Sequence, residues 1–306
     1  MAILDKILAS CIPLVPKAFM RPLSLRYIAG ESREDALERG RHLQDSAYLT
    51  TFDLLGEAVT NNSEIDAAAS EYKSLIQTLT DNGFPVNVSL KPTQMGLDIS
   101  QDICFETVSS IVSLAQQQQG FVRYEMEESS TIDGTLAVFE RLREAHQDNI
   151  GCVLQAMLFR THGDAQRLLG SNPRQLNVRM VKGIYVEPAS DAYQEMSEIN
   201  ASYLKTTRLL LENGAYVAVA THDPLILAGV AQILEDLPEA KERVEIQMLL
   251  GVQETFRRQT HEAGYTVRVY IPYGKEWHKY VTRRLKRNPK LARHALTGMF
   301  GKREKL

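Results

Sequence analysis

A helical segment that ends at a glycine, followed by a short valine-rich strand, recurs along this chain. Clear examples are DNGFPVNVSLK, QQGFVRYEME, ENGAYVAVATHD and EAGYTVRVYIPYG. Glycine tolerates the left-handed backbone that ends a helix, and β-branched residues favour the strand that follows. Strands of the same type are predicted at 47–57, 152–159, 176–185 and 244–251. The pattern therefore predicts eight strands.

Amphipathic or polar helical stretches separate these strands, for example at 68–79, 134–146, 198–213 and 254–264. Strands that alternate with crossover helices are parallel and buried on both faces. Eight such units close into a (βα)8 barrel of the TIM type, which takes ~250 residues. A doubly wound open sheet is the alternative, but the chain has no G-x-G-x-x-G after its first strand and no P-loop. We predict an α/β barrel over 46–300, an N-terminal helical arm over 1–45 and a basic C-terminal tail over 301–306.

Composition is that of an ordinary globular protein, with 44% hydrophobic and 24% charged residues among 306. The net charge of −3 argues against a general nucleic-acid binder. Residues 277–306 nevertheless hold ten Lys or Arg and one acid, Glu304. This basic excess either keeps the C-terminus soluble, which we favour, or makes peripheral contact with an anionic membrane surface.

The three cysteines, Cys11, Cys104 and Cys152, form no C-x-x-C pair. Neither a disulfide framework nor a cysteine metal site is therefore indicated. A reducing, cytoplasmic interior fits this cysteine usage. No run approaches the ~18 apolar residues of a membrane span, so any membrane contact is expected to be peripheral.

Polar residues gather where the predicted strands end: Asp53, Glu57, Lys91, Glu125, Glu127, Gln155, Arg179, Lys182, Thr221, His222, Asp223, Gln247 and Tyr270. In a (βα)8 barrel the active site lies at the carboxyl ends of the strands. Unpaired charges buried along a barrel axis are costly. A ligand site therefore explains these residues better than a structural core does.

Several of these residues keep two interpretations. Lys91, just before Pro92, either faces the site or ends its strand in solvent. Asp53 and Glu125 either supply the countercharge of that lysine or form structural pairs. His222 has no second histidine at ligand spacing, so we expect it to form hydrogen bonds and we expect no metal site.

Seven segments, in this order, resemble successive signatures of the proline dehydrogenase family: VSLKPTQMG, YEMEES, VLQAMLFR, VRMVKGIYVEP, ATHDP, VEIQMLLGV and VRVYIPYGKEWHKYVTRRL. The similarity runs from about Asp53 to Arg284. It implies a distorted (βα)8 barrel that holds FAD and oxidises L-proline to Δ1-pyrroline-5-carboxylate. It also implies the stand-alone, short bacterial type of enzyme, with a membrane quinone as electron acceptor.

Matched position by position, the resemblance implies a substrate pocket beside a flavin. The implied substrate-binding residues are Asp53, Lys91, Tyr185, Tyr270, Tyr280, Arg283 and Arg284. The implied cofactor-binding residues are Met126, Gln155, Arg179, Val181, Lys182, Gly183, Ile184, Thr221, His222 and Gln247. Catalytic roles are expected for Lys91, Glu125, Arg179 and Tyr270. Within these sets, Arg283 and Arg284 would clamp the substrate carboxylate, and Arg179 would stabilise negative charge on the flavin.

Three positions depart from the family pattern. Glu125 stands where the family usually has Asp, Ile184 stands where it has Ala, and Leu250 stands where a tyrosine or another ring is common. These departures leave open an altered cyclic-amine substrate or a catalytically weak flavin-binding protein. A Schiff-base aldolase built on Lys91 or Lys182 is an alternative from a different reaction class.

Overall fold

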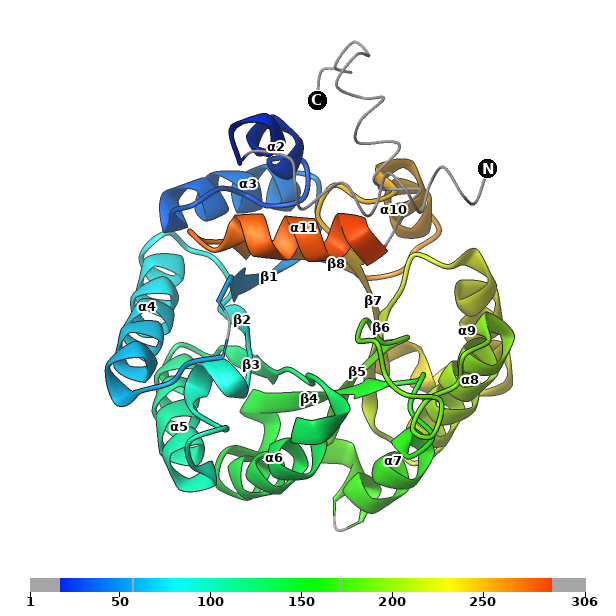
Figure 1. The fold of residues 1–306 in the computed structure, drawn as a ribbon. Helices are drawn as coiled ribbons and strands as arrows, with labels where there is room; N and C mark the ends of the chain where they lie inside the picture. Colours follow the sequence, from blue (N-terminus) through cyan, green and yellow to red (C-terminus); the bar gives the residue numbers. More distant parts are fainter. Residues whose placement is uncertain (1–16, 57, 171, 288–306) are drawn as a thin grey trace.

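The computed structural model describes residues 17–56, 58–170 and 172–287, and within them the chain forms a closed barrel of eight parallel strands (Figure 1). The strands are β1 (Leu49–Leu54), β2 (Asn87–Leu90), β3 (Phe121–Tyr124), β4 (Ile150–Gln155), β5 (Asn177–Val181), β6 (Tyr216–Ala220), β7 (Val244–Leu249) and β8 (Val267–Tyr273). Each strand pairs with the next along the chain, and β8 pairs with β1 to close the ring. The predicted (βα)8 fold is confirmed.

Ten α-helices are described, besides short 3-10 turns: α2 (Lys17–Ser24), α3 (Arg33–Asp45), α4 (Asn62–Asp81), α5 (Gln101–Gln117), α6 (Ile132–His146), α7 (Thr161–Leu169), α8 (Met196–Glu212), α9 (Pro224–Asp236), α10 (Glu254–Glu262) and α11 (Trp277–Arg287). The four helical stretches quoted from the sequence match α4, α6, α8 and α10. Short polar side chains fix several helix starts, since Ser32, Asn61, Ser100 and Asp223 each accept backbone N–H bonds as N-caps.

The glycine that follows a helix takes the expected left-handed backbone at three of the four quoted junctions: Gly83, Gly214 and Gly264 have φ of 71°, 87° and 89°. At the fourth junction the left-handed residue is Gln119, with φ of 54°, and the glycine follows it. Gly120 has a steric role instead, because a Cβ there would lie 2.6 Å from Cγ1 of Val86.

Alternate residues of the strands have opposite roles, as the two-residue period of a strand requires. Phe52, Val88, Val122, Val178 and their equivalents on the other strands pack with the surrounding helices into one apolar core. The residues between them face the barrel axis, and many are polar: Thr51, Asp53, Ser89, Arg123, Arg179, Glu245, Gln247 and Arg268. The apolar core therefore lies outside the barrel, and charge fills its centre.

The barrel departs from the regular pattern where its first and last strands meet. Helix α3, from the N-terminal part of the chain, packs against β8 and β1. Helix α11, which follows β8, instead forms a second apolar cluster with α2, Leu55 and Val252. Leu55 and Val252 follow β1 and β7, so α11 lies over the carboxyl end of the barrel, closer to its axis than α3 (Figure 1).

Two helices, α2 and α3, precede the barrel where an N-terminal helical arm was expected. The segment before Lys17 and the predicted tail at 301–306 lie outside the described residues. The domain boundaries therefore stay predictions. No helix in the described part of the chain is long and apolar enough to cross a membrane.

Candidate active site

The predicted site residues converge on the carboxyl end of the barrel. The strands themselves carry Asp53 (β1), Gln155 (β4), Arg179 and Val181 (β5), Gln247 (β7) and Tyr270 (β8). The segments that follow the strands carry Lys91, Glu125, Met126, Lys182, Gly183, Ile184, Tyr185, Thr221 and His222, and α11 carries Tyr280 and Arg284. Arg283 is also on α11, but its side chain and residue Glu57 lie outside what the structure describes.

Lys91 faces the site and binds Asp53. Its Nζ lies 2.9 and 3.2 Å from the two carboxylate oxygens, and the two side chains are only 13% and 1% exposed. Burial opposes the charge of the amine, but the field and hydrogen bonds of Asp53 outweigh burial and raise the pKa of Lys91. Lys91 is therefore a cation at neutral pH, held by a nearly fully buried carboxylate.

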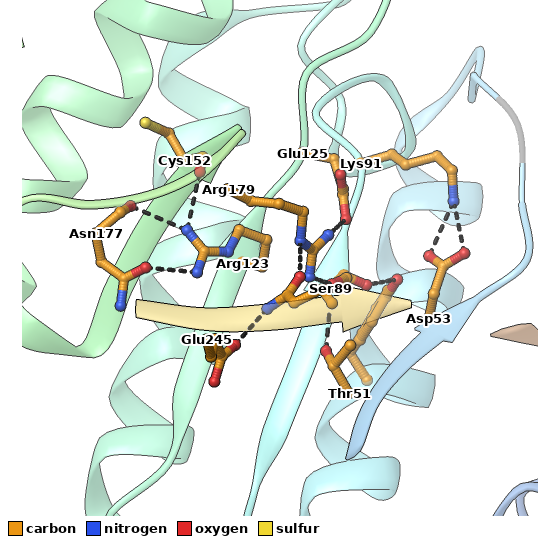
Figure 2. A network of polar contacts seen from close by, with 12 residues as sticks. Thr51, Asp53, Ser89, Lys91, Arg123, Glu125, Cys152, Asn177, Arg179 and Glu245 are labelled. Carbon is orange, nitrogen blue, oxygen red and sulfur yellow. Dashed lines mark hydrogen bonds and ion pairs between the residues drawn. The ribbon is translucent and has the colours of Figure 1, made fainter. Parts of the chain in front are cut away.

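Arg179 is fixed by three polar partners. Its Nε donates to the side-chain oxygen of Gln247, one terminal nitrogen donates to Glu125, and the other donates to Ser89 Oγ at 3.0 Å. The ring of Tyr270 lies against the guanidinium, with 5.3 Å between its centroid and Cζ. Glu125 thus pairs with Arg179, while Asp53 is the carboxylate that contacts Lys91 (Figure 2).

A second charged layer lies one step further into the barrel. Glu245 accepts two hydrogen bonds from Arg268, at 2.8 and 2.9 Å, and one from Tyr216 at 3.1 Å. Arg123 has no carboxylate and donates instead to the backbone oxygens of Cys152 and Asn177, both at 2.9 Å. Burial and the nearby charge of Arg179 lower the pKa of Arg123 to about 9.

Sequence reasoning did not single out Ser89, Arg123, Glu245 or Arg268. A usable signal was present, because Arg123, Glu245 and Arg268 each stand two residues before a predicted site residue, which lies on the same strand for Glu245 and Arg268 and directly after β3 for Arg123. A further clue was Gly151, where a Cβ would lie 2.5 Å from a terminal nitrogen of Arg123. The glycine leaves room for the guanidinium.

Gln155 has an acceptor without a partner at the end of β4. Its Nε2 donates to the backbone oxygen of Glu127 at 2.7 Å, whereas its buried Oε1 has no hydrogen-bond partner. Glu127 in turn accepts from the backbone N–H and the hydroxyl of Thr93, both at 2.9 Å. An orphaned buried acceptor is costly unless a ligand N–H or O–H reaches it.

The segments after β5 and β6 form the rest of the rim. Lys182 donates to Asp223, which also caps α9. The Nε2 atom of His222 accepts the backbone N–H of Leu249 at 3.1 Å, in agreement with the hydrogen-bonding role predicted for it. Burial and the charges of Arg284 and Arg257 lower the pKa of His222 to about 4, so its ring is neutral at pH 7.

Apolar side chains line the same rim: Phe159, Ile184, Val186, Met196 and Leu225 are all at least 46% exposed. Gly183 turns the chain after β5 with φ of 112°, and a Cβ there would lie 2.3 Å from Met157 Sδ. Met126 is buried, and Val181 and Tyr185 pack half-buried against the main core. The hydroxyl of Thr221 accepts the backbone N–H of Asp223.

Helix α11 brings a tyrosine and an arginine to this end of the barrel. Arg284 donates to the Tyr280 hydroxyl at 2.5 Å, and its Cζ lies 5.7 Å from the centroid of that ring. The two residues are one helical turn apart, so they share a face of α11. Among the described residues no group of His, Cys, Asp or Glu side chains could hold a metal ion.

Comparison with known proteins decides the family. The family model described as Proline dehydrogenase matches residues 36–294. Proline dehydrogenase 1 of Bacillus subtilis is 32% identical over 277 residues, which are 90% of each protein. The chain belongs to the proline dehydrogenase family. A proline dehydrogenase of Deinococcus radiodurans is 33% identical over 282 residues, covering 91% of this chain and 90% of that protein.

Solved structures of the proline dehydrogenase family share the barrel. Proline utilization A from Bdellovibrio bacteriovorus, in a structure inactivated by N-propargylglycine, superposes with a TM-score of 0.82 at 26% identity. The match covers 88% of this chain and 33% of the other, so the chain spans about a third of that larger protein. The likeness in sequence and fold makes this chain a proline dehydrogenase in enzyme class.

Proposed function

We propose that the chain oxidises L-proline to Δ1-pyrroline-5-carboxylate with FAD as its cofactor. The observation that carries this proposal is the linked cation pair at the carboxyl end of the barrel. Lys91 directly follows β2, two residues after Ser89, and Ser89 accepts from Arg179. The two cations are therefore neighbours, held by Asp53 and Glu125 (Figure 2).

The residues of the rim fit a flavin. An isoalloxazine ring is flat and carries hydrogen-bonding edges, so it needs apolar surface together with donors and acceptors. Ile184 and Leu225 supply exposed apolar surface, Gln155 supplies an unpartnered acceptor, and Arg179 supplies a fixed cation. The bound flavin would take up the hydride from C5 of proline.

The side chains would prepare the substrate for that step. Proline must lose a proton from its ring nitrogen, and the nearby ammonium of Lys91 disfavours a second positive charge there. Arg284, with Arg283 beside it in the sequence, would bind the carboxylate, and Tyr280 holds the Arg284 guanidinium by a hydrogen bond. Tyr270, stacked on Arg179, would pack against the pyrrolidine ring.

We further propose a membrane quinone as the electron acceptor and a cytoplasmic location with peripheral membrane contact. The buried free thiols of Cys104 and Cys152 support a reducing compartment. The Schiff-base alternative needs a lysine that readily loses its proton. Asp53 raises the pKa of Lys91, which disfavours that alternative.

One measurement tests the proposed function. The purified protein is loaded with FAD, and L-proline is added without oxygen while the flavin absorbance near 450 nm is followed. Bleaching supports the oxidation. A flavin spectrum that proline leaves unchanged would indicate a silent flavin-binding protein or another cyclic-amine substrate. A colourless protein that borohydride traps with a carbonyl compound would favour the aldolase.

Arg284→Ala tests the substrate clamp. We expect KM for proline to rise about a hundredfold, because a charged hydrogen-bonding partner of the carboxylate is lost. The Kd for FAD should change less than about threefold. An equal loss of affinity for proline and FAD would contradict a carboxylate clamp at this position.

A further inference from the structure

A chain of buried hydrogen bonds connects Arg179 to the opposite side of the barrel interior. Arg179 Nε donates to Gln247 Oε1, and Gln247 Nε2 donates to Glu245 Oε1. Glu245 is then held by both nitrogens of an Arg268 fork. Figure 2 shows Glu245 on the far side of the Arg179 network from Glu125.

The three members that lead from Arg179 to Glu245 lie away from water. Glu245, Gln247 and Arg179 are 3%, 4% and 4% exposed. In such an environment a hydrogen bond is strong and an unpaired polar group is costly. The arrangement therefore has little freedom to relax when one member changes.

The amide of Gln247 has one donor end and one acceptor end, and its two neighbours fix which end goes where. Glu245 is a carboxylate and only accepts, so it takes the NH2 group. The amide oxygen is then turned toward Arg179, whose Nε only donates. With the opposite orientation, two donors would face each other at Arg179 and two acceptors would face each other at Glu245.

We propose that Glu245 is a positioning residue for proline oxidation: through the amide of Gln247 it sets the orientation of the Arg179 guanidinium. This inference rests on the proposed FAD site, because Arg179 is the cation placed to act on the flavin. Glu245 lies one residue beyond the direct contacts of Arg179, and its effect on the reaction passes through Gln247.

Two substitutions break this link in different ways. Glu245→Gln replaces one of the two acceptor oxygens by an NH2 group, either at Oε1, which serves Gln247 and Arg268, or at Oε2, which serves Arg268 and Tyr216. The Gln247 amide then no longer faces a group that can only accept, so its orientation is no longer fixed. Gln247→Met removes both hydrogen bonds with little change in volume, and it leaves the ion pair of Glu245 with Arg268 intact. Gln247→Met therefore decides the question if the first variant does not fold.

The readouts are the midpoint potential of the bound flavin, kcat, and KM for proline. In both variants we expect a more negative midpoint potential and a kcat about ten- to a hundredfold lower, the usual effect of misplacing a group that contacts the reacting centre. KM for proline should change less than about threefold. Tyr216→Phe is the matched control, since it removes one contact to Glu245 and leaves the Arg268 fork and Gln247 in place.

A double-mutant cycle with Arg179→Lys tests whether the effect of Glu245 reaches the flavin site through Gln247 and Arg179. Lysine keeps the charge but has no Nε donor for Gln247, so Glu245→Gln and Gln247→Met should each add less than about a twofold change in that background. Effects that multiply in the Arg179→Lys background would overturn the proposal, and so would wild-type values in Gln247→Met. A wild-type protein that binds no FAD would instead overturn the proposed function, which separates the two failures.

Discussion

Inside this barrel, single side chains are held by charge, whereas TIM-type barrels are usually filled by branched apolar residues. Asp53, Glu125 and Glu245 each contact a cation, and all three lie in the centre of the barrel or at its rim. A buried charge is tolerated when it is paired and costly when its partner is removed. The stability of the barrel therefore depends on these individual residues.

Asp53→Asn tests this dependence. The substitution leaves the buried ammonium of Lys91 without its contacting carboxylate, so we expect the free energy of unfolding to fall by about 3 kcal/mol. Urea unfolding measures the change. Asp53→Asn combined with Lys91→Met removes both charges and should regain most of the loss. A single variant as stable as wild type would show that the pair is not desolvated.

His222 makes stability depend on pH. Its pKa is about 4 in the folded chain and near 6.5 when unfolded, so the unfolded state binds more protons between these values. Stability should fall as pH drops through this window, by roughly 3 kcal/mol at pH 4. His222→Gln keeps an acceptor for Leu249 but does not titrate. Unfolding of both proteins from pH 7 to 4 isolates the contribution, and parallel curves would contradict it.

The sequence predicted which residues meet at the site, because strand ends in a barrel converge whatever their side chains do. Which carboxylate pairs with which cation was not predictable in the same way. Glu125 was a candidate partner for Lys91, yet it binds Arg179, which stands on β5. The choice depends on the stagger between strands that are distant in sequence, and no local pattern encodes that stagger.

Among the elements, the turn after β5 constrains the site most tightly. Gly183 has φ of 112°, a backbone that side-chain-bearing residues rarely adopt, and it lies against Met157. We expect Gly183→Ala to destabilise the protein by more than about 1 kcal/mol. Affinity for FAD should fall as well, since Lys182 and Ile184 flank this turn.

Gly163→Ala is the matched control for that substitution. Gly163 lies in α7, and nothing lies within 4 Å of a Cβ added there. Alanine should stabilise the helix by up to about 1 kcal/mol without changing FAD affinity. Thermal unfolding with and without FAD compares the two variants. Equal and small effects would argue that the turn after β5 tolerates a side chain.

Helix α11 shows where prediction from the sequence stops at the scale of elements. The structure describes this helix from Trp277 to Arg287, where the sequence had shown only a basic segment that resembles the family. The sequence does not say what covers the apolar face. A regular barrel would place this helix beside β8 and β1, but α3 packs there, so α11 pairs with α2 over the barrel's carboxyl end.

At the scale of the whole molecule, the described chain has two apolar clusters with different tasks. The large cluster joins the barrel to its helices, and the small one holds α11 through Met20, Tyr27, Trp277 and Val281. Tyr280 and Arg284 are on that same helix. The small cluster therefore controls the proposed substrate clamp, while the large cluster controls the stability of the barrel.

Val281→Ala and Val217→Ala separate these tasks, because both valines are fully buried and lose the same two methyl groups. Val217 lies on β6 in the large cluster, so Val217→Ala should lower the free energy of unfolding by about 2 kcal/mol and leave KM for proline nearly unchanged. Val281→Ala should instead loosen the packing of α11, raise KM for proline about tenfold and increase hydrogen exchange in that helix alone. If Val217→Ala raised KM as much as Val281→Ala, the two clusters would act as one core, and the clamp would depend on the barrel as a whole.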